Sequence, residues 1–317
     1  MKKLLTTSLL VLLAALFYPV HATNVSGNVS GIWTLANSPY DVTGDVTVPS
    51  GQTLEIRPGV QVLFTGHYKF NVFGNLQAIG TEQDSIVFTR AFPTEESKWW
   101  GIRFLNAGSA NRLQYCVIEF GNASISGNED DHGGGVYCIN TSPVISHCNF
   151  RHNSASWAGG GLCAHSCTLQ IDSCVLALNS SFYGGGALFW DCSVLVTGCV
   201  FANNNSTSHG GAVAFAPTGQ LPSIFTRCTF VNNASPTLGG GIYCNDRNVS
   251  TNSCIVWANS GPGYQACGNI TYSDIQGGYS GTGNINADPM FVDTANGDFH
   301  LLVPFLERLS RKLVSVV

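Results

Sequence analysis

Hydrophobic and polar residues alternate over short segments along most of this chain. In "GDVTVPSGQTLEIRPGVQVLF", which starts at Gly44, every second residue of "VTV", "LEI" and "VQVLF" is apolar, and Pro or Gly separates the segments. The segments "YKFNVFGNLQAIG", "SIVFT" and "WWGIRFL" continue this pattern. A period of two with β-branched and aromatic residues is typical of half-buried strands. The pattern therefore predicts short β-strands that are joined by tight turns.

A repeat of about 26 residues organises the second half of the chain. Gly-rich tetrads start at positions 133, 159, 184, 210 and 239, and a Cys follows each start by 15 residues, or by 18 in the fourth repeat. An apolar residue lies two positions after that Cys, and an Asn lies five positions after it. The two series are Cys148, Cys174, Cys199, Cys228 and Cys254, and Asn153, Asn179, Asn204, Asn233 and Asn259.

The fourth repeat shows where the chain tolerates an insertion. Its three additional residues fall within "APTGQLPS", whereas the tetrad before it and the Cys-x-Phe-x-x-Asn after it keep their spacing. An insertion that leaves both flanks in phase belongs in a loop between elements that stack on their counterparts.

These observations predict an all-β chain that forms a single parallel β-helix, a solenoid with three short strands per coil. Successive coils would be about 4.8 Å apart, and residues 40–285 leave room for roughly ten of them. The Cys and Phe/Leu/Val series would stack inside the coils. The Asn series would adopt left-handed backbone geometry and hydrogen-bond along the stack, and the glycines would supply positive φ where the chain enters a strand.

Two groups of repeat motifs carry a resemblance to known proteins. The tetrads, together with "FRHN", "FANN" and "FVNN", resemble the repeats of chlamydial polymorphic outer-membrane proteins, which act as adhesins. The segments "TVPSGQTLEIRPGVQVLF", "WWGIRF" and "ADPMFVDTANGDFHL" resemble exported bacterial right-handed β-helix repeat proteins of the pectin-lyase-like kind. The resemblance implies a right-handed parallel β-helix. It leaves the function open, because this fold also carries pectate lyases and polygalacturonases.

The first residues have the features of an export signal. Lys2 and Lys3 precede the apolar segment "LLTTSLLVLLAALF", and Val20-His21-Ala22 resembles a cleavage site, so we expect a signal peptide at 1–22. The expected domain is then 23–301, with an N-terminal cap at 23–45, regular repeats at 133–259 and an atypical tail at 302–317. We expect a secreted or cell-surface protein of a Gram-negative-type bacterium, with no membrane span after removal of the signal.

Composition narrows the possible partners. Only 10% of the 317 residues are charged and the net charge is −5, so no broad basic surface is available for nucleic acid. We expect a monomer. Twelve cysteines are present, and those of the repeat series are predicted to be buried thiols, because strands in register hold neighbouring Cβ atoms parallel. Cys163 with Cys167, or Cys192 with a neighbour, are the predicted disulfides.

Catalytic groups are scarce in the repeats. Residues 133–245 contain four charged residues, Arg151, Asp172, Asp191 and Arg227, and both acids occupy turn positions of the repeat. His132 and His209 share one repeat position but lie three coils apart, about 14 Å, too far to share a metal. The main alternative is a polysaccharide lyase or glycoside hydrolase that acts on an acidic polysaccharide. Its site would lie near 90–132, where Arg90, Arg103, Arg112 and Glu119 occur.

Two clusters in this region are candidate binding sites. The loop 121–132 holds Glu129, Asp130 and Asp131, which form either a solvated loop or a weak calcium site. Calcium is the one cofactor that the sequence suggests. Trp99 and Trp100, with Arg103, either stack on sugar rings or support the fold. Taken together, the sequence favours a non-catalytic exported β-helix with a surface for adhesion or carbohydrate binding. Its partner would be a polysaccharide or a glycan or protein of a host or cell surface.

Overall fold

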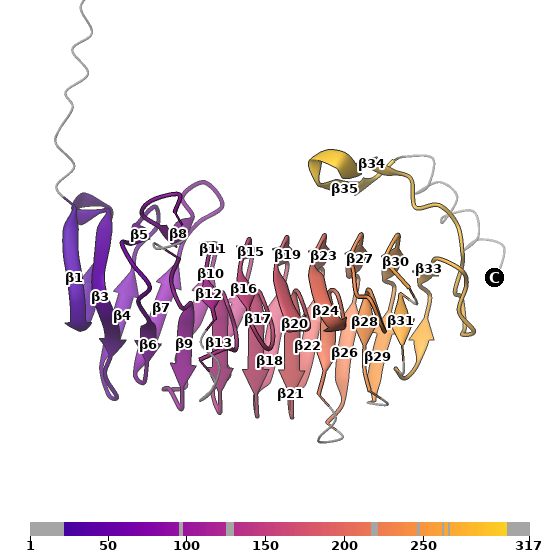
Figure 1. Ribbon diagram of the computed structural model, residues 1–317, viewed down its shortest axis with the longest axis horizontal. Helices are drawn as coiled ribbons and strands as arrows, with labels where there is room; N and C mark the ends of the chain where they lie inside the picture. The colour runs from indigo at the N-terminus through magenta and orange to yellow at the C-terminus, as the bar shows by residue number, and fades with distance from the viewer. Residues whose placement is uncertain are drawn as a thin grey trace, which may run out of the picture.

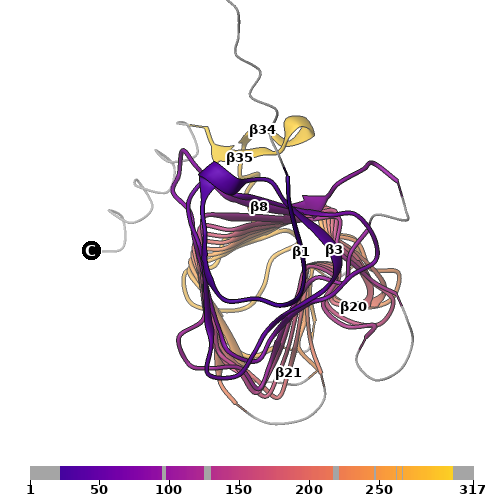
Figure 2. The same cartoon turned by 90° about the vertical axis from the view of Figure 1, so that its left-hand side faces the viewer.

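The chain winds into a solenoid of parallel strands. The computed structural model describes residues 22–94, 98–124, 130–216, 221–245, 248–261, 263–265 and 267–302. Apart from their residues nearest the domain, the predicted signal peptide and the predicted tail lie outside these residues. Strands from β1 to β33 follow one another along the long axis (Figure 1), and the end-on view shows them enclosing one core (Figure 2).

Three stacks of strands form the walls of the solenoid. Stack 1 contains β6 (Phe70–Val72), β9 (Ile102–Leu105), β13 (Val136–Ile139), β17 (Leu162–His165), β21 (Ala187–Trp190), β25 (Val213–Phe215), β28 (Ile242–Tyr243) and β31 (Tyr264–Gln265). Stack 2 contains β2 (Gly31–Trp33), β4 (Thr53–Ile56), β7 (Asn75–Ile79), β10 (Arg112–Gln114), β14 (Val144–Ser146), β18 (Thr168–Asp172), β22 (Ser193–Thr197), β26 (Ser223–Thr226), β29 (Val249–Asn252) and β32 (Ile270–Thr271). Stack 3 contains β5 (Gln61–Phe64), β8 (Ile86–Arg90), β11 (Cys116–Glu119), β15 (Asn149–Arg151), β19 (Val175–Ala177), β23 (Val200–Ala202), β27 (Thr229–Val231), β30 (Ile255–Trp257) and β33 (Asp274–Ile275).

The first coil joins two of these stacks. The long strand β3 (Tyr40–Val48) pairs with β5 through its first half and with β6 through its second half, so stacks 1 and 3 are continuous at this end. The strands β1 (Thr23–Asn28) and β2 already pair in parallel with β3 and β4. Residues 23–45, expected to form a cap, thus contribute strands to the solenoid itself.

The solenoid is close to the expected size and has one additional feature. Stack 2 has ten strands but stack 1 has eight, so there are about eight complete turns, against the expected count of roughly ten coils. Four coils also carry a short fourth strand, β12 (Asn122–Ala123), β16 (Ser154–Ala155), β20 (Ser180–Tyr183) or β24 (Asn205–His209), in a separate sheet that sequence analysis did not predict. In Figure 2 the stack that contains β20 forms a bulge outside the main tube. The fourth-repeat insertion lies in the connection between β25 and β26, as expected for a loop.

The chain leaves the solenoid after its last coil. An antiparallel pair, β34 (Phe291–Asp293) and β35 (Asp298–Leu301), follows the last parallel strands and lies outside the stacks (Figure 1). Short 3-10 turns occur at Leu35–Asn37 and Thr294–Asn296. Within the described part of the chain, no helix has the length and apolar character needed to cross a membrane.

The cysteine series lies in the core as reduced thiols, as the sequence predicted. Cys116, Cys148, Cys174, Cys199, Cys228 and Cys254 are buried and free. The Sγ atom of Cys174 accepts a hydrogen bond from the backbone N–H of Cys148, one coil earlier, at 3.4 Å. Burial raises the pKa of the Cys148 and Cys174 thiols well above the ordinary value, which keeps them protonated and unreactive.

The predicted disulfides are wrong. Cys163, Cys167 and Cys192 are buried and form no disulfide bond, and the disulfide joins Cys244 to Cys267. Cys167 and Cys192 belong to a second core series in register, in which the N–H of Cys167 donates to the Sγ of Cys192 at 3.4 Å. Cys267 lies in a turn after β31 and is free of this constraint, so its Cβ can face the Cβ of Cys244.

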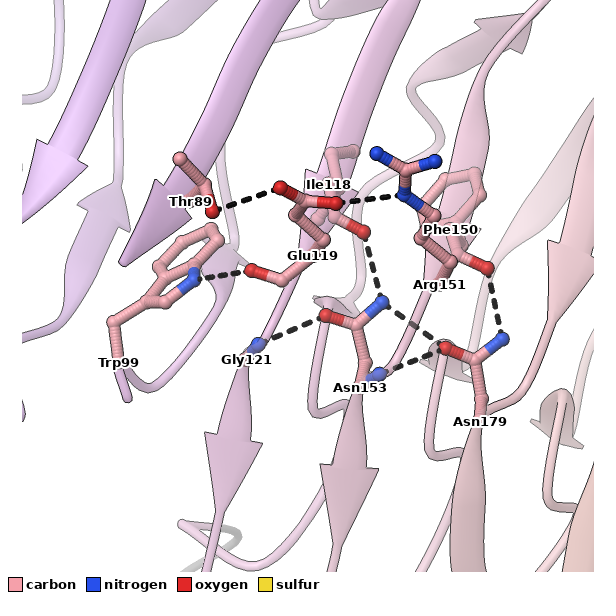
Figure 3. A network of polar contacts seen from close by, with 9 residues as sticks. All are labelled: Thr89, Trp99, Ile118, Glu119, Gly121, Phe150, Arg151, Asn153 and Asn179. Carbon is pink, nitrogen blue, oxygen red and sulfur yellow. Dashed lines mark hydrogen bonds and ion pairs between the residues drawn. The ribbon is translucent and has the colours of Figure 1, made fainter. Parts of the chain in front are cut away.

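Buried asparagines form a second ladder along the axis. The Nδ2 of Asn153 donates to the Oδ1 of Asn179 at 3.1 Å, and the Nδ2 of Asn179 donates to the carbonyl of Phe150 at 2.9 Å (Figure 3). The Nδ2 of Asn179 also donates to the Oδ1 of Asn204 in the next coil, at 3.0 Å. Each of these asparagines is 1% exposed. The expected positive φ belongs to the residue before each ladder Asn, such as Leu178 with φ 58°, and not to the Asn itself.

The first tetrad glycines have the predicted left-handed geometry. Gly184 has φ 63°, a conformation that L-residues with a Cβ rarely adopt. A Cβ on the next residue, Gly185, would lie 2.5 Å from the carbonyl oxygen of Asn205 in the following coil. The tetrad is therefore needed where the backbone of the fourth-strand segment crosses close to the next coil.

We expect the ladder to carry much of the stability of each coil. Asn179→Ala removes the acceptor for the N–H of Asn153 and the donor for the carbonyl of Phe150, and both groups are buried. Leaving two such groups unpaired should lower the free energy of unfolding by about 2–4 kcal/mol in a chemical denaturation experiment. Asn205→Ala, at an exposed position of the neighbouring fourth strand, is the control and should change it by less than about 0.5 kcal/mol. Equal effects of the two variants would contradict the role of the ladder.

The thiol content gives a second test of the core. Ten of the twelve cysteines are free and two form the disulfide. A thiol reagent should therefore label ten cysteines in denatured, unreduced protein and twelve after reduction, while the native protein reacts slowly because its thiols are buried. Fewer than ten labelled thiols before reduction would reveal disulfides within the core series.

Candidate functional site

The outer face of stack 1 carries a row of side chains that differ from coil to coil. In β13, Val136 and Cys138 are core residues, whereas Tyr137 belongs to a separate buried cluster on the other face of the strand. The equivalent positions in later coils are Cys163, Leu188, Ala214 and Tyr243. These residues form the floor of a groove that runs along the solenoid axis.

A second row of residues forms the wall of this groove. Parallel bridges connect His132 to Ala158, Ala158 to Tyr183, and His209 to Leu238, each residue directly preceding a tetrad. His209 also pairs with Tyr183 through β20 and β24. The wall is therefore the segment that leads from the small fourth-strand sheet back into stack 1.

Two adjoining hollows define the groove between floor and wall. Each has a volume of about 310 Å³, and Trp157 and Trp190 line both of them. We call this feature the aromatic groove and define it by Tyr137, Trp157, Tyr183, Trp190, His209 and Tyr243. Another hollow, of about 760 Å³, lies at the turns of residues 268–282 but is lined by one aromatic side chain, Tyr279.

Ring contacts hold the aromatic side chains of the groove in place. Trp157 stacks on Phe182 at 5.2 Å between ring centroids and meets Tyr183 edge to face at 5.4 Å. Trp190 stacks on His165 at 5.2 Å. Trp157 is 43% exposed, so one of its faces is available to solvent, and its partners fix the orientation of the ring.

The groove is poor in charge. His209, with its Nδ1 2.6 Å from the Oγ of Ser208, has its pKa lowered by burial, which favours the neutral ring. The four charged residues of 133–245 lie outside the linings of both hollows. Arg151, for example, pairs with Glu119 on stack 3. An apolar, aromatic hollow with a few neutral polar groups is typical of binding sites for uncharged ligands.

Charged side chains gather at the N-terminal end of the groove, where they neutralise one another. The carboxylate of Asp130 contacts the Nζ of Lys69 at 2.8 Å and the Nη2 of Arg103 at 3.7 Å. The carboxylate of Asp131 contacts the Nδ1 of His132 at 2.6 Å. Arg103, also a predicted ligand-binding residue, is 3% exposed and lies over the ring of Tyr137, 4.8 Å from its centroid.

These contacts change the case for calcium. The repulsion between neighbouring acids was the reason to expect a cation, and for Asp130 that repulsion is offset by Lys69 and Arg103. No group of three potential metal ligands occurs among the described residues. Glu129 lies outside them, and the calcium site stays a prediction.

The two neighbouring tryptophans have partners within the protein. Trp99 is fully buried, stacks on Phe64 at 4.0 Å, and its Nε1 donates to the carbonyl of Glu119 at 2.9 Å (Figure 3). Its prediction as a ligand-binding residue is wrong, because the ring is part of the core. Trp100 stacks on His67 at 4.3 Å, and the Nζ of Lys69 lies over its ring, 4.8 Å from the centroid.

The residues suggested for an enzyme site are spread over several faces. Glu119 accepts hydrogen bonds from Thr89 at 2.9 Å and from Arg151 at 2.6 Å (Figure 3). Arg90 lies over the ring of Phe120, 4.0 Å from the centroid, whereas Arg112 is exposed on stack 2. The structure therefore does not bring these arginines together around Glu119.

The sequence analysis did not predict the aromatic groove, although the residues that line it occupy fixed positions relative to each tetrad. They lie one and two residues before each tetrad, and four and six residues after its first glycine. Unlike the core series, these positions change residue type from coil to coil, for example Ile139, His165, Trp190 and Ala216. The signal was an enrichment in aromatic residues and His at repeat positions that keep no fixed type.

The chain matches one known family of repeat proteins. Residues 100–277, more than half of the chain, match the family model described as right-handed β-helix region. The chain belongs to this family, which confirms the predicted fold class. No curated protein and no solved structure matches the chain at a significant level.

The position of His209 predicts a dependence of stability on pH. Its pKa is lower in the folded protein than the ordinary value of about 6.5. At pH values well above about 6.5 the ring is neutral in both the folded and the unfolded chain, so its titration does not change stability there. As pH falls below about 6.5, the unfolded chain binds the proton more readily and stability decreases, until the folded-state pKa is passed. Between pH about 7.5 and 5, the wild type should lose more free energy of unfolding than His209→Gln. His152, whose pKa is also lowered, by burial first, is present in both proteins. Equal losses would contradict this assignment.

Proposed function

We propose that the protein is an exported, non-catalytic β-helix that binds carbohydrate through the aromatic groove, as part of a role at a surface. Membership of the right-handed β-helix family supports a surface or polysaccharide-related role in general terms. The aromatic groove supports the more specific proposal, since the apolar faces of sugar rings pack on aromatic side chains while their hydroxyl groups bond to polar neighbours.

One observation carries the proposal. Trp157 comes from the wall of the groove and Trp190 from its floor. Each of the two indoles lines both hollows. A chain of sugar rings that lies in the groove would contact both indoles. The partly exposed ring of Trp157 has no structural need to face solvent, because burying it would stabilise the fold.

A polysaccharide lyase or glycoside hydrolase is the second candidate. The observation that favours it is the Asp131–His132 hydrogen bond of 2.6 Å at the end of the groove, an arrangement that orients a histidine as a general base. Catalysis would also need a group that stabilises developing charge. The nearby guanidinium of Arg103 already contacts Asp130 and the carbonyl of His132.

Substitution of the two tryptophans tests the proposal. Trp157→Ala and Trp190→Ala should each weaken binding to soluble polysaccharides by about tenfold or more, a loss of about 1.4 kcal/mol per factor of ten, as measured by affinity electrophoresis and calorimetry. Leu195→Ala is the matched control, because Leu195 is an exposed apolar residue of stack 2 in the same coil, and it should leave binding unchanged.

Two results would contradict the proposal. Binding that is equally strong in all three variants would place the carbohydrate elsewhere. Turnover of a polysaccharide that is lost in His132→Ala would favour the enzyme instead.

A further inference from the structure

We infer that the aromatic groove takes an uncharged, linear polysaccharide whose chain lies along the solenoid axis. This inference rests on the proposed carbohydrate binding and adds the class of ligand and its direction. Three features carry it: the charge around the groove, the continuity of the groove, and the spacing of its aromatic rings.

The described residues around the groove disfavour polyanions. Residues 133–245 contain two basic residues, Arg151 and Arg227, and neither lines the hollows. Arg151 is paired with Glu119, and Arg227 is an exposed turn residue between β26 and β27, strands of stacks 2 and 3. If every sugar carried a carboxylate, each carboxylate would lose water against aromatic rings without gaining a cation as a partner, which costs free energy for every sugar bound. The net charge of −5 of the protein would also repel a polyanion.

The cations at the N-terminal end do not change this conclusion. Lys69 and Arg103 both contact the carboxylate of Asp130, and the neighbouring Asp131 supplies a second negative charge, so the formal charges of these four residues sum to zero. An acidic sugar at this end would have to compete with Asp130 for them. The polar groups nearer the middle are His165 and His209, whose rings can exchange hydrogen bonds with hydroxyl groups in the neutral state.

The continuity of the groove sets the direction of the chain. Its floor is built from equivalent positions of successive coils, and the two hollows adjoin at Trp157 and Trp190. A ligand that fills both hollows therefore runs across the strands and along the axis. Coil spacing is about 4.8 Å, comparable to the advance of one sugar in an extended 1,4-linked chain, so successive rings meet equivalent positions of successive coils.

The spacing also predicts the length of chain that the groove accepts. The groove extends over the coils of the five tetrads, from His132 to Asn245. Five coils have four intervals of about 4.8 Å between them, so the groove spans about 19 Å, which corresponds to about four to five sugars in an extended chain. Aromatic rings occur at several points along this span rather than at one end, which favours contact with the interior of a polymer.

The experiment compares neutral and acidic polymers on the whole protein. The neutral probes are hydroxyethylcellulose, xylan and glucomannan, and the acidic probes are polygalacturonate and alginate. We expect the neutral polymers to bind at least about tenfold more tightly, and their affinity to change less than about twofold when salt is raised from about 0.05 to about 0.5 M, because no ion pair forms. Among β-1,4-linked oligosaccharides, affinity should rise with length and level off at about four to five sugars.

Variants keep this inference separate from the proposed function. Trp157→Ala should abolish most binding of the neutral polymers while leaving the melting temperature almost unchanged, because this indole is partly exposed. Tighter, salt-sensitive binding of the acidic polymers that Trp157→Ala removes would overturn the neutral ligand but leave the groove as the binding site. An affinity that levels off at two sugars would overturn the axial arrangement. Absence of binding to every probe would overturn both the inference and the proposed function.

Discussion

Hydrogen bonding along the solenoid axis is the interaction on which the rest of this structure depends. Backbone groups of each coil bond to the next coil, as in the 2.9 Å contact from the N–H of Ser180 to the carbonyl of Asn153. Where the chain turns away from stack 3, the strand ladder ends and buried backbone groups would be left unpaired. The asparagine ladder supplies their partners through contacts such as Asn179 to Phe150. This requirement keeps the same residue type at that turn in successive repeats.

The same constraint creates the groove. The first two tetrad glycines let the backbone turn with positive φ and pass close to the next coil, as at Gly184 and Gly185. The chain then enters stack 1 beside the wall that it has just formed, so wall residues face floor residues along the five tetrad coils. Core positions are restricted by packing and ladder positions by hydrogen bonds. The positions of Trp157 and Trp190 belong neither to the buried core nor to the ladder, so their residue types can vary from coil to coil.

Several charged side chains beside the groove and on stack 3 are paired within the protein. Asp130 is held by Lys69 and Arg103, and Glu119 is held by Arg151 and Thr89 (Figure 3). Asp130 and Asp131 are thereby held at the entrance to the regular coils, next to His132, which lines one end of the groove. No described Asp, Glu, Lys or Arg lines the two hollows, and this property, more than the fold, is the basis for the ligand class that we propose.

The sequence alone determined the architecture, because the spacing of residues within each repeat defines the register in which the coils stack. The interval from tetrad to Cys and from Cys to Asn fixes which residues stack, and strand periodicity fixes which of them point inward, so the coils, the reduced core cysteines and the loop insertion could all be predicted. Only the tertiary structure decided what lies on the outside. The fourth strand turns Trp157 toward Trp190, the packing of Phe64 draws Trp99 into the core, and Lys69 reaches Asp130 from 61 residues away. These contacts join residues at unrelated repeat positions or outside the repeat. Periodicity cannot report such contacts, because it relates each residue only to its equivalents in neighbouring coils.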